Sequence, residues 1–238
     1  KKQAKKKFQV KLSPNKKPEH LSESEWQYGL RVQMAEQTLF DIKPISKDSI
    51  YVDYIVQNIN AKSAYKVAFR GQYSHGNYCD CYDFKTNQLG ICKHIAAVEQ
   101  YIQKKPSLRR QLKTEFIPSY SSMCLNYLGD HSIKLRFGMD DTNKLMKLFK
   151  PYLNADHSLN EKGYLQIDQL LRKAKAIQSS FVCYPDALDF ILTWREQQAR
   201  QEFLSPYVRK NKLPALKSLK VNLFPYQVEG VLFTALAG

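Results

Sequence analysis

The spacing of apolar residues divides the first half of the chain into strand-like and helix-like segments. Apolar and polar residues alternate over residues 50–56 and 65–69, which are rich in β-branched and aromatic side chains and are therefore predicted strands. The spacing becomes helical after residue 94, and the predicted helix must end before Pro106. The apolar face of this helix holds Ile95, Val98, Tyr101 and Ile102.

An earlier helix is marked by its start signal. Ser22 is predicted to cap it, because Glu25 follows three positions later as the partner in a capping box. The stretch before this helix contains Pro14 and Pro18, which are typical of a linker.

Strands and helices continue in the second half of the chain. Residues 123–127 and 132–137 are predicted to pair as a hairpin. Helices are predicted at 166–178 and 185–203. A further helix, capped by an aspartate at 140 or 141, should bury Leu145, Leu148 and Phe149. With strands early and helices late, the predicted fold class is α+β.

The composition is that of a basic globular protein. The 238 residues include 37 Lys or Arg and 22 Asp or Glu, and 37 − 22 gives a net charge of +15. Twelve Phe, fifteen Tyr and two Trp are enough to build cores and exclude wholesale disorder. No apolar run approaches the length of a membrane span, and the start lacks the apolar segment of a secretory signal. We therefore expect a cytoplasmic protein without a membrane partner.

The positive charge is unevenly distributed. The first seventeen residues hold eight lysines and no acidic residue, so the rest of the chain carries 15 − 8, or +7. Such a block can bind phosphate backbones, but a solvated tail is a sufficient explanation for it. A strongly basic chain nevertheless makes nucleic acid a better candidate partner than any cationic molecule.

Three cysteines and one histidine are crowded into sixteen residues. Cys79 and Cys81 are two apart, as residues on one face of a strand would be. Cys92 and His94 lie at the start of the predicted helix, where the backbone favours a thiolate. Three thiols and an imidazole form a complete tetrahedral ligand set, so we predict a structural zinc site.

A disulfide, an iron–sulfur cluster and a catalytic zinc each fit these four residues less well. A disulfide leaves one cysteine over, an iron–sulfur cluster more often uses four cysteines, and a catalytic zinc keeps one position open. Buried cysteines beside an unrelated histidine remain the simplest alternative. Cys124 and Cys183 are predicted to be small core residues. Candidate nucleic-acid contacts near the cluster, for which ordinary solvated side chains are an equal alternative, are Arg70, Tyr82, Lys85 and Lys93.

The cluster and the residues that follow it resemble a known family. The pattern Cys-x-Cys, a gap, Cys-x-His and then Ile95-Ala96-Ala97-Val98 is similar to the SWIM zinc finger. The resemblance covers about residues 65–103. It implies a small ββα zinc-binding module, which in this family binds DNA or protein partners and occurs in bacterial Swi/Snf-type ATPases.

A second resemblance lies near residue 238. Spacing alone predicts an apolar helix that buries Val228, Val231, Leu232 and Ala235. The stretch from Leu223 to Gly230 also resembles the Q motif of Swi/Snf-type ATPases in helicase superfamily two. This resemblance implies that Gln227 reads the adenine edge and that Phe224 and Tyr226 help to build the base pocket. No phosphate-binding loop or acidic box occurs, so ATP and Mg²⁺ are expected only in a larger parent protein.

Together the two resemblances imply a domain order. We expect a basic tail and linker at 1–18, an α+β region with the zinc finger at 19–115, a mixed strand and helix helicase-associated region at 116–215, and the start of an ATPase core at 216–238. The chain would be the regulatory or binding part of a bacterial DNA helicase or translocase in the cytoplasm, where the nucleoid is one expected location. Alternatively, it packs on the ATPase core of the same protein without binding nucleic acid.

Overall fold

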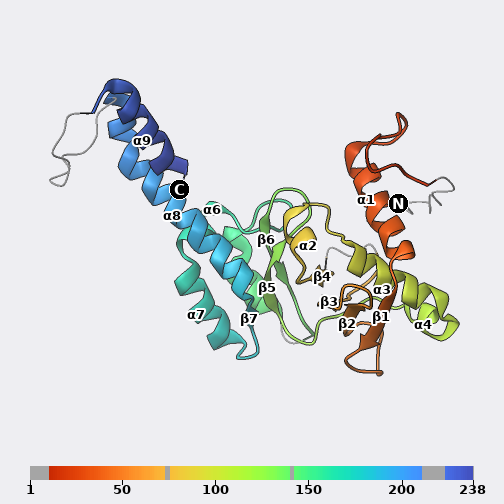
Figure 1. Cartoon of the computed structure of the whole chain (residues 1–238). Coiled ribbons are helices and arrows are strands. Elements are labelled where there is room, and N and C mark those ends of the chain that lie inside the picture. The colour runs from red at the N-terminus through yellow and green to blue at the C-terminus, as the bar shows by residue number, and fades with distance from the viewer. Residues whose placement is uncertain (1–10, 73–75, 140–141, 211–222, 238) are drawn as a thin grey trace. The chain divides into compact units, whose positions relative to one another are not determined.

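The fold is described from a computed structural model that covers residues 11–72, 76–139, 142–210 and 223–237. The chain forms two compact units, each of which is described by itself (Figure 1). The N-terminal unit runs up to Pro118 and also includes Asn126–Ser132. The C-terminal unit takes Ser119–Leu125 and continues from Ile133. The described elements are a mixture of helices and small sheets, so the fold is α+β as predicted.

A four-stranded antiparallel sheet forms the framework of the N-terminal unit. Its strands, in the order β1-β2-β3-β4, are β1 (Phe40–Pro44), β2 (Asp53–Asn58), β3 (Ala64–Ala68) and β4 (Tyr78–Cys79). Tyr54 and Val56 of β2 are buried while Ile55 between them is exposed, which is the alternation expected of a sheet with one covered face. Val67 of β3 pairs with Cys79, so the register fixes the backbone position of the first cysteine.

The helices of this unit are α1 (Glu23–Gln37), the short α2 (Tyr82–Thr86), α3 (Lys93–Lys104) and α4 (Pro106–Gln111). α3 packs against all four strands, α2 contacts β4, and α1 and α4 pack against α3. The helix predicted after residue 94 is α3, whose Val98 and Ile102 are fully buried. The predicted capping box of α1 is confirmed, because Ser22 Oγ accepts a hydrogen bond from the Glu25 amide and the Glu25 carboxylate accepts one from the Ser22 amide.

The segment before α1 lies against that helix. Leu12 is buried together with Leu21 and Trp26. The Trp26 indole N–H donates to the carbonyl of Ser13 at 3.0 Å, and the Gln33 amide both donates to and accepts from the backbone of Leu12. The described end of the stretch expected to be a tail and linker is therefore part of the N-terminal unit.

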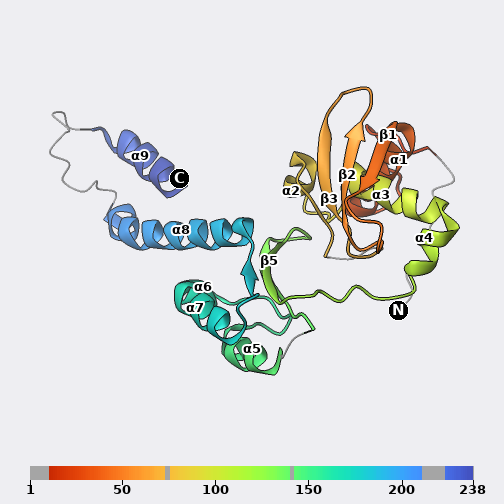
Figure 2. The same cartoon turned by 90° about the horizontal axis from the view of Figure 1, so that it is seen from below.

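The C-terminal unit is built from a small sheet and packed helices. The sheet has the order β6-β5-β7, with β5 (Ser122–Asn126) parallel to β7 (Val182–Cys183) and β6 (Ser132–Arg136) on the other side. The helices are α5 (Thr142–Phe149), α6 (Glu161–Leu165), α7 (Ile167–Ile177) and α8 (Pro185–Lys210), with a 3₁₀ turn at Lys150–Tyr152. Figure 2 shows α5 beside α7. The core between these elements includes Met123, Ile133, Leu145, Phe149, Leu170, Phe181 and Ile191.

The elements predicted from the sequence agree with the structure where they are long. Two of them differ by three residues or more at one end: β2 begins three residues later than predicted, at Asp53, and α8 continues through Pro206 to Lys210 instead of ending at Phe203. The short elements β1, β7, α2, α4 and α6 were missed, because two to six residues give too few periods for a pattern. The predicted aspartate cap of α5 at 140 or 141 lies outside the described residues.

The last helix, α9 (Pro225–Ala237), packs against α8 of the same unit. Leu232 is buried, but Val231 is 43% exposed. The face that is covered contains Val228, Leu232, Ala235 and Leu236, so the predicted buried face was wrong for Val231. The reason is that the helix is apolar on most sides, and spacing alone does not select one of them. In the described parts of the chain, no helix combines the length and the apolar character that crossing a membrane requires.

Candidate metal centre

The four predicted ligands come together in the N-terminal unit. The three cysteine sulfurs and a ring nitrogen of His94 lie within 4.8 Å of one another, and all four residues are buried. His94 Nδ1 lies 3.7 Å from Cys79 Sγ and 3.9 Å from Cys92 Sγ. Such a Cys₃His cluster could hold a metal ion.

Three separate elements position the cluster. Cys79 ends β4, Cys92 is the N-cap of α3, and His94 is in the first turn of α3. The sequence prediction placed Cys81 on a strand with Cys79, but Cys81 is the N-cap of α2. Its Sγ accepts a hydrogen bond from the Phe84 amide at 3.4 Å. The reason for the difference is that β4 stops at Cys79, and burial of Phe84 folds the next residues into a helical turn.

The spacing of the donors fits a tetrahedral ion. Zinc bonds of about 2.3 Å to sulfur and 2.0–2.1 Å to nitrogen hold neighbouring donors about 3.5–3.8 Å apart. The sulfur–nitrogen distances of 3.7 and 3.9 Å are close to this range. The donors are thus nearly in place without any change of backbone.

The electrostatics of the cluster favour a bound cation. Hydrogen bonding from Cys79 and Cys92 lowers the pKa of Cys81, so this sulfur is the preferred site of a first negative charge. The same hydrogen bond with Cys81 raises the pKa of Cys79, and burial raises the pKa of Cys92. A divalent cation among the sulfurs would supply the positive charge that allows the thiols to ionise.

Aromatic rings hold the imidazole of His94. The Tyr65 ring from β3 lies 4.4 Å from the imidazole centroid, and the Phe40 ring from β1 meets it edge-on at 5.5 Å. His94 Nε2 is buried and has no hydrogen-bond partner among the described residues. Since Nδ1 faces the sulfurs, Nδ1 would be the ligand atom of a bound metal, and ring packing would take the place of the outer hydrogen bond that usually orients such a histidine.

The packing around α2 was not predicted from the sequence. Phe84 contacts Tyr78 and Tyr127 at centroid distances of 5.6 and 5.0 Å, and Arg31 of α1 forms a 2.7 Å ion pair with Asp83. Tyr127 belongs to the β5–β6 hairpin tip, more than forty residues after Phe84, and no local pattern signals this contact. These side chains fix α2, and hence Cys81, in place.

The side chains near the cluster that were predicted to contact nucleic acid differ in their exposure and in the contacts they already make. Arg70 is engaged, since it forms a 2.8 Å ion pair with Asp53 and lies over the Phe116 ring. Tyr82 is 81% exposed and Lys85 is also exposed, both on α2. Lys93 is half-buried at the start of α3. The structure thus gathers Tyr82 and Lys85 on one surface and leaves Arg70 occupied in the sheet.

The three residues of the Q-motif resemblance lie together at the start of α9. Phe224 and Tyr226 are stacked at 5.9 Å and are both largely exposed. The Gln227 side-chain oxygen accepts a hydrogen bond from the Phe224 amide at 2.9 Å. Gln227 therefore caps its own helix here.

The two remaining cysteines are confirmed as packed residues of the C-terminal unit. Cys124 is buried, and Cys183 is half-buried. Burial raises the pKa of both thiols, that of Cys183 to about 11. Both are therefore poor nucleophiles at neutral pH.

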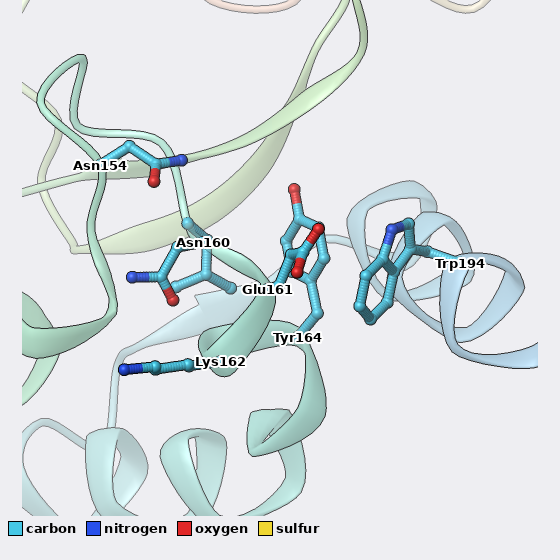
Figure 3. A pocket seen from close by; sticks show the side chains of 7 residues that line it. Asn154, Asn160, Glu161, Lys162, Tyr164 and Trp194 are labelled. Carbon is cyan, nitrogen blue, oxygen red and sulfur yellow. The ribbon is translucent and has the colours of Figure 1, made fainter. Parts of the chain in front are cut away.

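An open depression of about 550 Å³ also lies in the C-terminal unit (Figure 3). Tyr164 and Trp194 form one wall, with ring centroids 5.1 Å apart. The amides on the other side are used locally, since Asn160 caps α6 by accepting from the Gly163 amide and Asn154 donates to Ser158. Both amides are therefore engaged within the protein, and the charged residues of the lining are Glu161 and Lys162.

No known protein family, curated protein or solved structure matches the chain. Its function is therefore inferred from its own residues, and the Cys79, Cys81, Cys92 and His94 cluster is the feature with the most specific chemistry.

Proposed function

We propose that this chain is the N-terminal zinc-containing binding module of an ATP-dependent DNA helicase or translocase of the bacterial Swi/Snf type. The observation that carries the proposal is the buried Cys₃His cluster, whose pattern and spacing resemble a SWIM zinc finger. The ligands would be Cys79, Cys81, Cys92 and His94.

The zinc has a structural role in this proposal. Four protein ligands close the coordination shell and leave no position for a substrate or an activated water. The ligands come from β4, the start of α2 and the start of α3, so one ion would join all three elements. At such sites, the binding energy of the metal is also folding energy.

The proposed partner of the module is DNA. The net charge of +15 supplies sequence-independent attraction to phosphates. The parent protein would provide ATP and Mg²⁺ binding, and Phe224, Tyr226 and Gln227 would take part in the adenine site by their resemblance to the Q motif.

A second candidate function is autoregulation without nucleic acid. It is favoured by the exposed aromatic residues of α9 and the residue before it, where Phe224, Tyr226 and Phe233 are 65%, 68% and 75% exposed. Apolar side chains exposed together on one short segment are typical of a surface that another protein element covers. The ATPase core of the same protein would be that element.

Metal analysis and DNA binding test the proposal together. The 238-residue chain should contain one zinc and bind a DNA duplex with an affinity that falls steeply with salt. Cys92→Ala and His94→Ala should each lose the metal and unfold the N-terminal unit. Cys124→Ala, which removes a buried thiol outside the cluster, is the matched control and should keep the zinc.

Two results would contradict the proposal in different ways. Full zinc retention and unchanged stability in both ligand variants would rule out the metal site. No duplex binding at low salt, combined with affinity for a separately prepared ATPase core, would favour autoregulation instead.

A further inference from the structure

A cluster of basic residues lies at the junction of α3 and α4, away from the metal site. Residues 104–113 contain five basic side chains and no acidic one. All five are exposed, and together they are called the α3–α4 basic cluster: Lys104, Lys105, Arg109, Arg110 and Lys113.

These side chains lack carboxylate partners within the described residues. No ion pair in the described part of the chain includes any of them, although Arg31, Lys43, Lys66 and Arg70 of the same unit are all paired with aspartates. The contacts they do make are not with acids, since Arg110 donates to the Pro106 carbonyl and Lys105 lies over the Tyr101 ring. Two exposed acidic residues lie near the cluster. Glu36 lines a depression together with Lys104 and Arg109, and Glu115 follows the cluster in the sequence. The cluster therefore keeps a net positive charge.

The backbone under the cluster is held in place. The amide of Ile50 donates to the Gln111 side chain at 3.1 Å, and the Tyr51 hydroxyl donates to the carbonyls of Gln111 and Thr114. Tyr51 also packs against Phe116 at 5.8 Å. These charges are thus fixed on a folded surface, unlike charges in a tail. Binding a partner there therefore costs little conformational entropy of the backbone.

The cluster and the metal site lie at opposite ends of the N-terminal unit. Figures 1 and 2 both show α2 at one end and α4 at the other. The helix α3 connects them, with Cys92 capping its start and Lys104 in its last turn. Twelve residues at about 1.5 Å each make this helix about 18 Å long.

Helix dipoles explain only part of the arrangement. Cations are favoured in the last turn of a helix, which accounts for Lys104 in α3 and for Arg109 and Arg110 in α4. Lys105 is both the C-cap of α3, where a cation is favoured, and the N-cap of α4, where it is not, so the two dipoles oppose each other there. Neither dipole accounts for the lack of acidic residues within residues 104–113. Repulsion among five exposed like charges is relieved when a polyanion binds.

We infer that the α3–α4 basic cluster is the surface that binds the phosphodiester backbone of nucleic acid, and that the zinc site stabilises α3 without touching the nucleic acid itself. This inference rests on the proposed function for its choice of partner. It differs from the sequence-based expectation, which placed the candidate contacts near the metal at Arg70, Tyr82, Lys85 and Lys93.

A comparison of three double variants of the zinc-loaded chain tests this assignment. Arg109→Gln/Arg110→Gln removes two charges from the cluster, Lys85→Gln/Lys93→Gln removes two near the metal, and Lys173→Gln/Lys175→Gln removes two exposed charges from α7 as the matched control. Fluorescence anisotropy with a labelled duplex of about 20 base pairs across a salt series gives the affinity and its salt slope. Zinc content and thermal unfolding verify that each variant is folded.

The cluster variant should bind roughly tenfold or more weakly than the wild type, and its salt slope should fall by up to about 1.8, because each phosphate contact contributes about 0.9. The α7 control should stay within about twofold of the wild type, since it changes only the net charge.

Three outcomes would overturn the assignment. If the cluster variant behaves like the α7 control, the cluster is solvated surface, and DNA binding by the chain still stands. A larger loss in Lys85→Gln/Lys93→Gln would move the interface to the metal site. Absence of salt-dependent binding by the wild-type chain would remove the DNA partner, and the proposed function with it, whatever the variants do.

Discussion

The two units of this chain differ in the kind of side chains that fill their interiors. Among the described residues, the C-terminal unit encloses an apolar core of twelve buried residues that runs from Met123 to Ile191. The N-terminal unit also buries apolar residues, but its β4, α2 and α3 meet at three thiols and an imidazole, which are polar groups that need a partner. One unit can therefore be stable by packing alone, whereas the interior of the other contains a cluster that could hold a metal ion.

Removal of the metal should produce the largest difference in stability between the two units. Structural zinc contributes roughly 10–16 kcal/mol of apparent binding energy in small zinc-finger peptides, so a strong chelator should unfold the region around β4, α2 and α3. The C-terminal unit should be unaffected. Hydrogen exchange with and without chelator would show protection lost over residues 78–104 and kept over 167–177. Equal loss in both units would contradict a difference between them.

A matched pair of core substitutions tests whether the two units are stabilised independently. Phe149 and Phe84 are both almost fully buried, but Phe149 stacks on Phe181 in the apolar core, while Phe84 supports Cys81. Phe149→Ala should destabilise the C-terminal unit by about 3–5 kcal/mol and leave zinc content unchanged. Phe84→Ala should weaken zinc retention, measured by competition with a chromophoric chelator. Loss of zinc in Phe149→Ala as well would show that the units are not independent.

The smallest expected effect concerns a carboxylate of the N-terminal sheet. Burial acts to raise the pKa of Asp53, but hydrogen bonds and charge from Lys66 and Arg70 outweigh it and lower the pKa below 3.8. A carboxyl group whose pKa is lower in the folded than in the unfolded state stabilises the protein at pH values above its unfolded-state pKa. This contribution is lost as the pH falls through the folded-state pKa. Asp53→Asn should therefore cost about 1 kcal/mol or less, because solvent screens the pair.

Paired urea unfolding of the wild type and Asp53→Asn would check the pH dependence. The difference in unfolding free energy should be constant between about pH 5 and 8 and should shrink only below about pH 4. A difference that already declines between about pH 8 and 5 would mean that another group is responsible. Asp156→Asn, at the exposed ion pair with Lys134 in the C-terminal unit, is the control and should change stability less.

Local signals in the sequence identified much of the fold and of the candidate site. The capping box at Ser22 and the apolar face of α3 are encoded by neighbouring residues, and both are present in the structure. The four candidate ligands were predicted because three thiols and an imidazole form a complete tetrahedral ligand set, and the structure brings these four side chains together. The placement of Cys81 was wrong because the alternation of a strand and the turn before a short helix look alike over three residues.

Residue type and short-range spacing thus determined the candidate ligand set, the long helices, the α+β class and the basic character of this protein. Tertiary structure alone decided which charges are available. Arg70 near the metal pairs with Asp53, whereas Arg109 and Arg110 form no ion pair among the described residues. Tertiary structure also brought Tyr127 against Phe84 and Tyr65 against His94. The physical reason is that ion pairs and ring contacts depend on distance in space, which residue order specifies only through the folded sheet and helices.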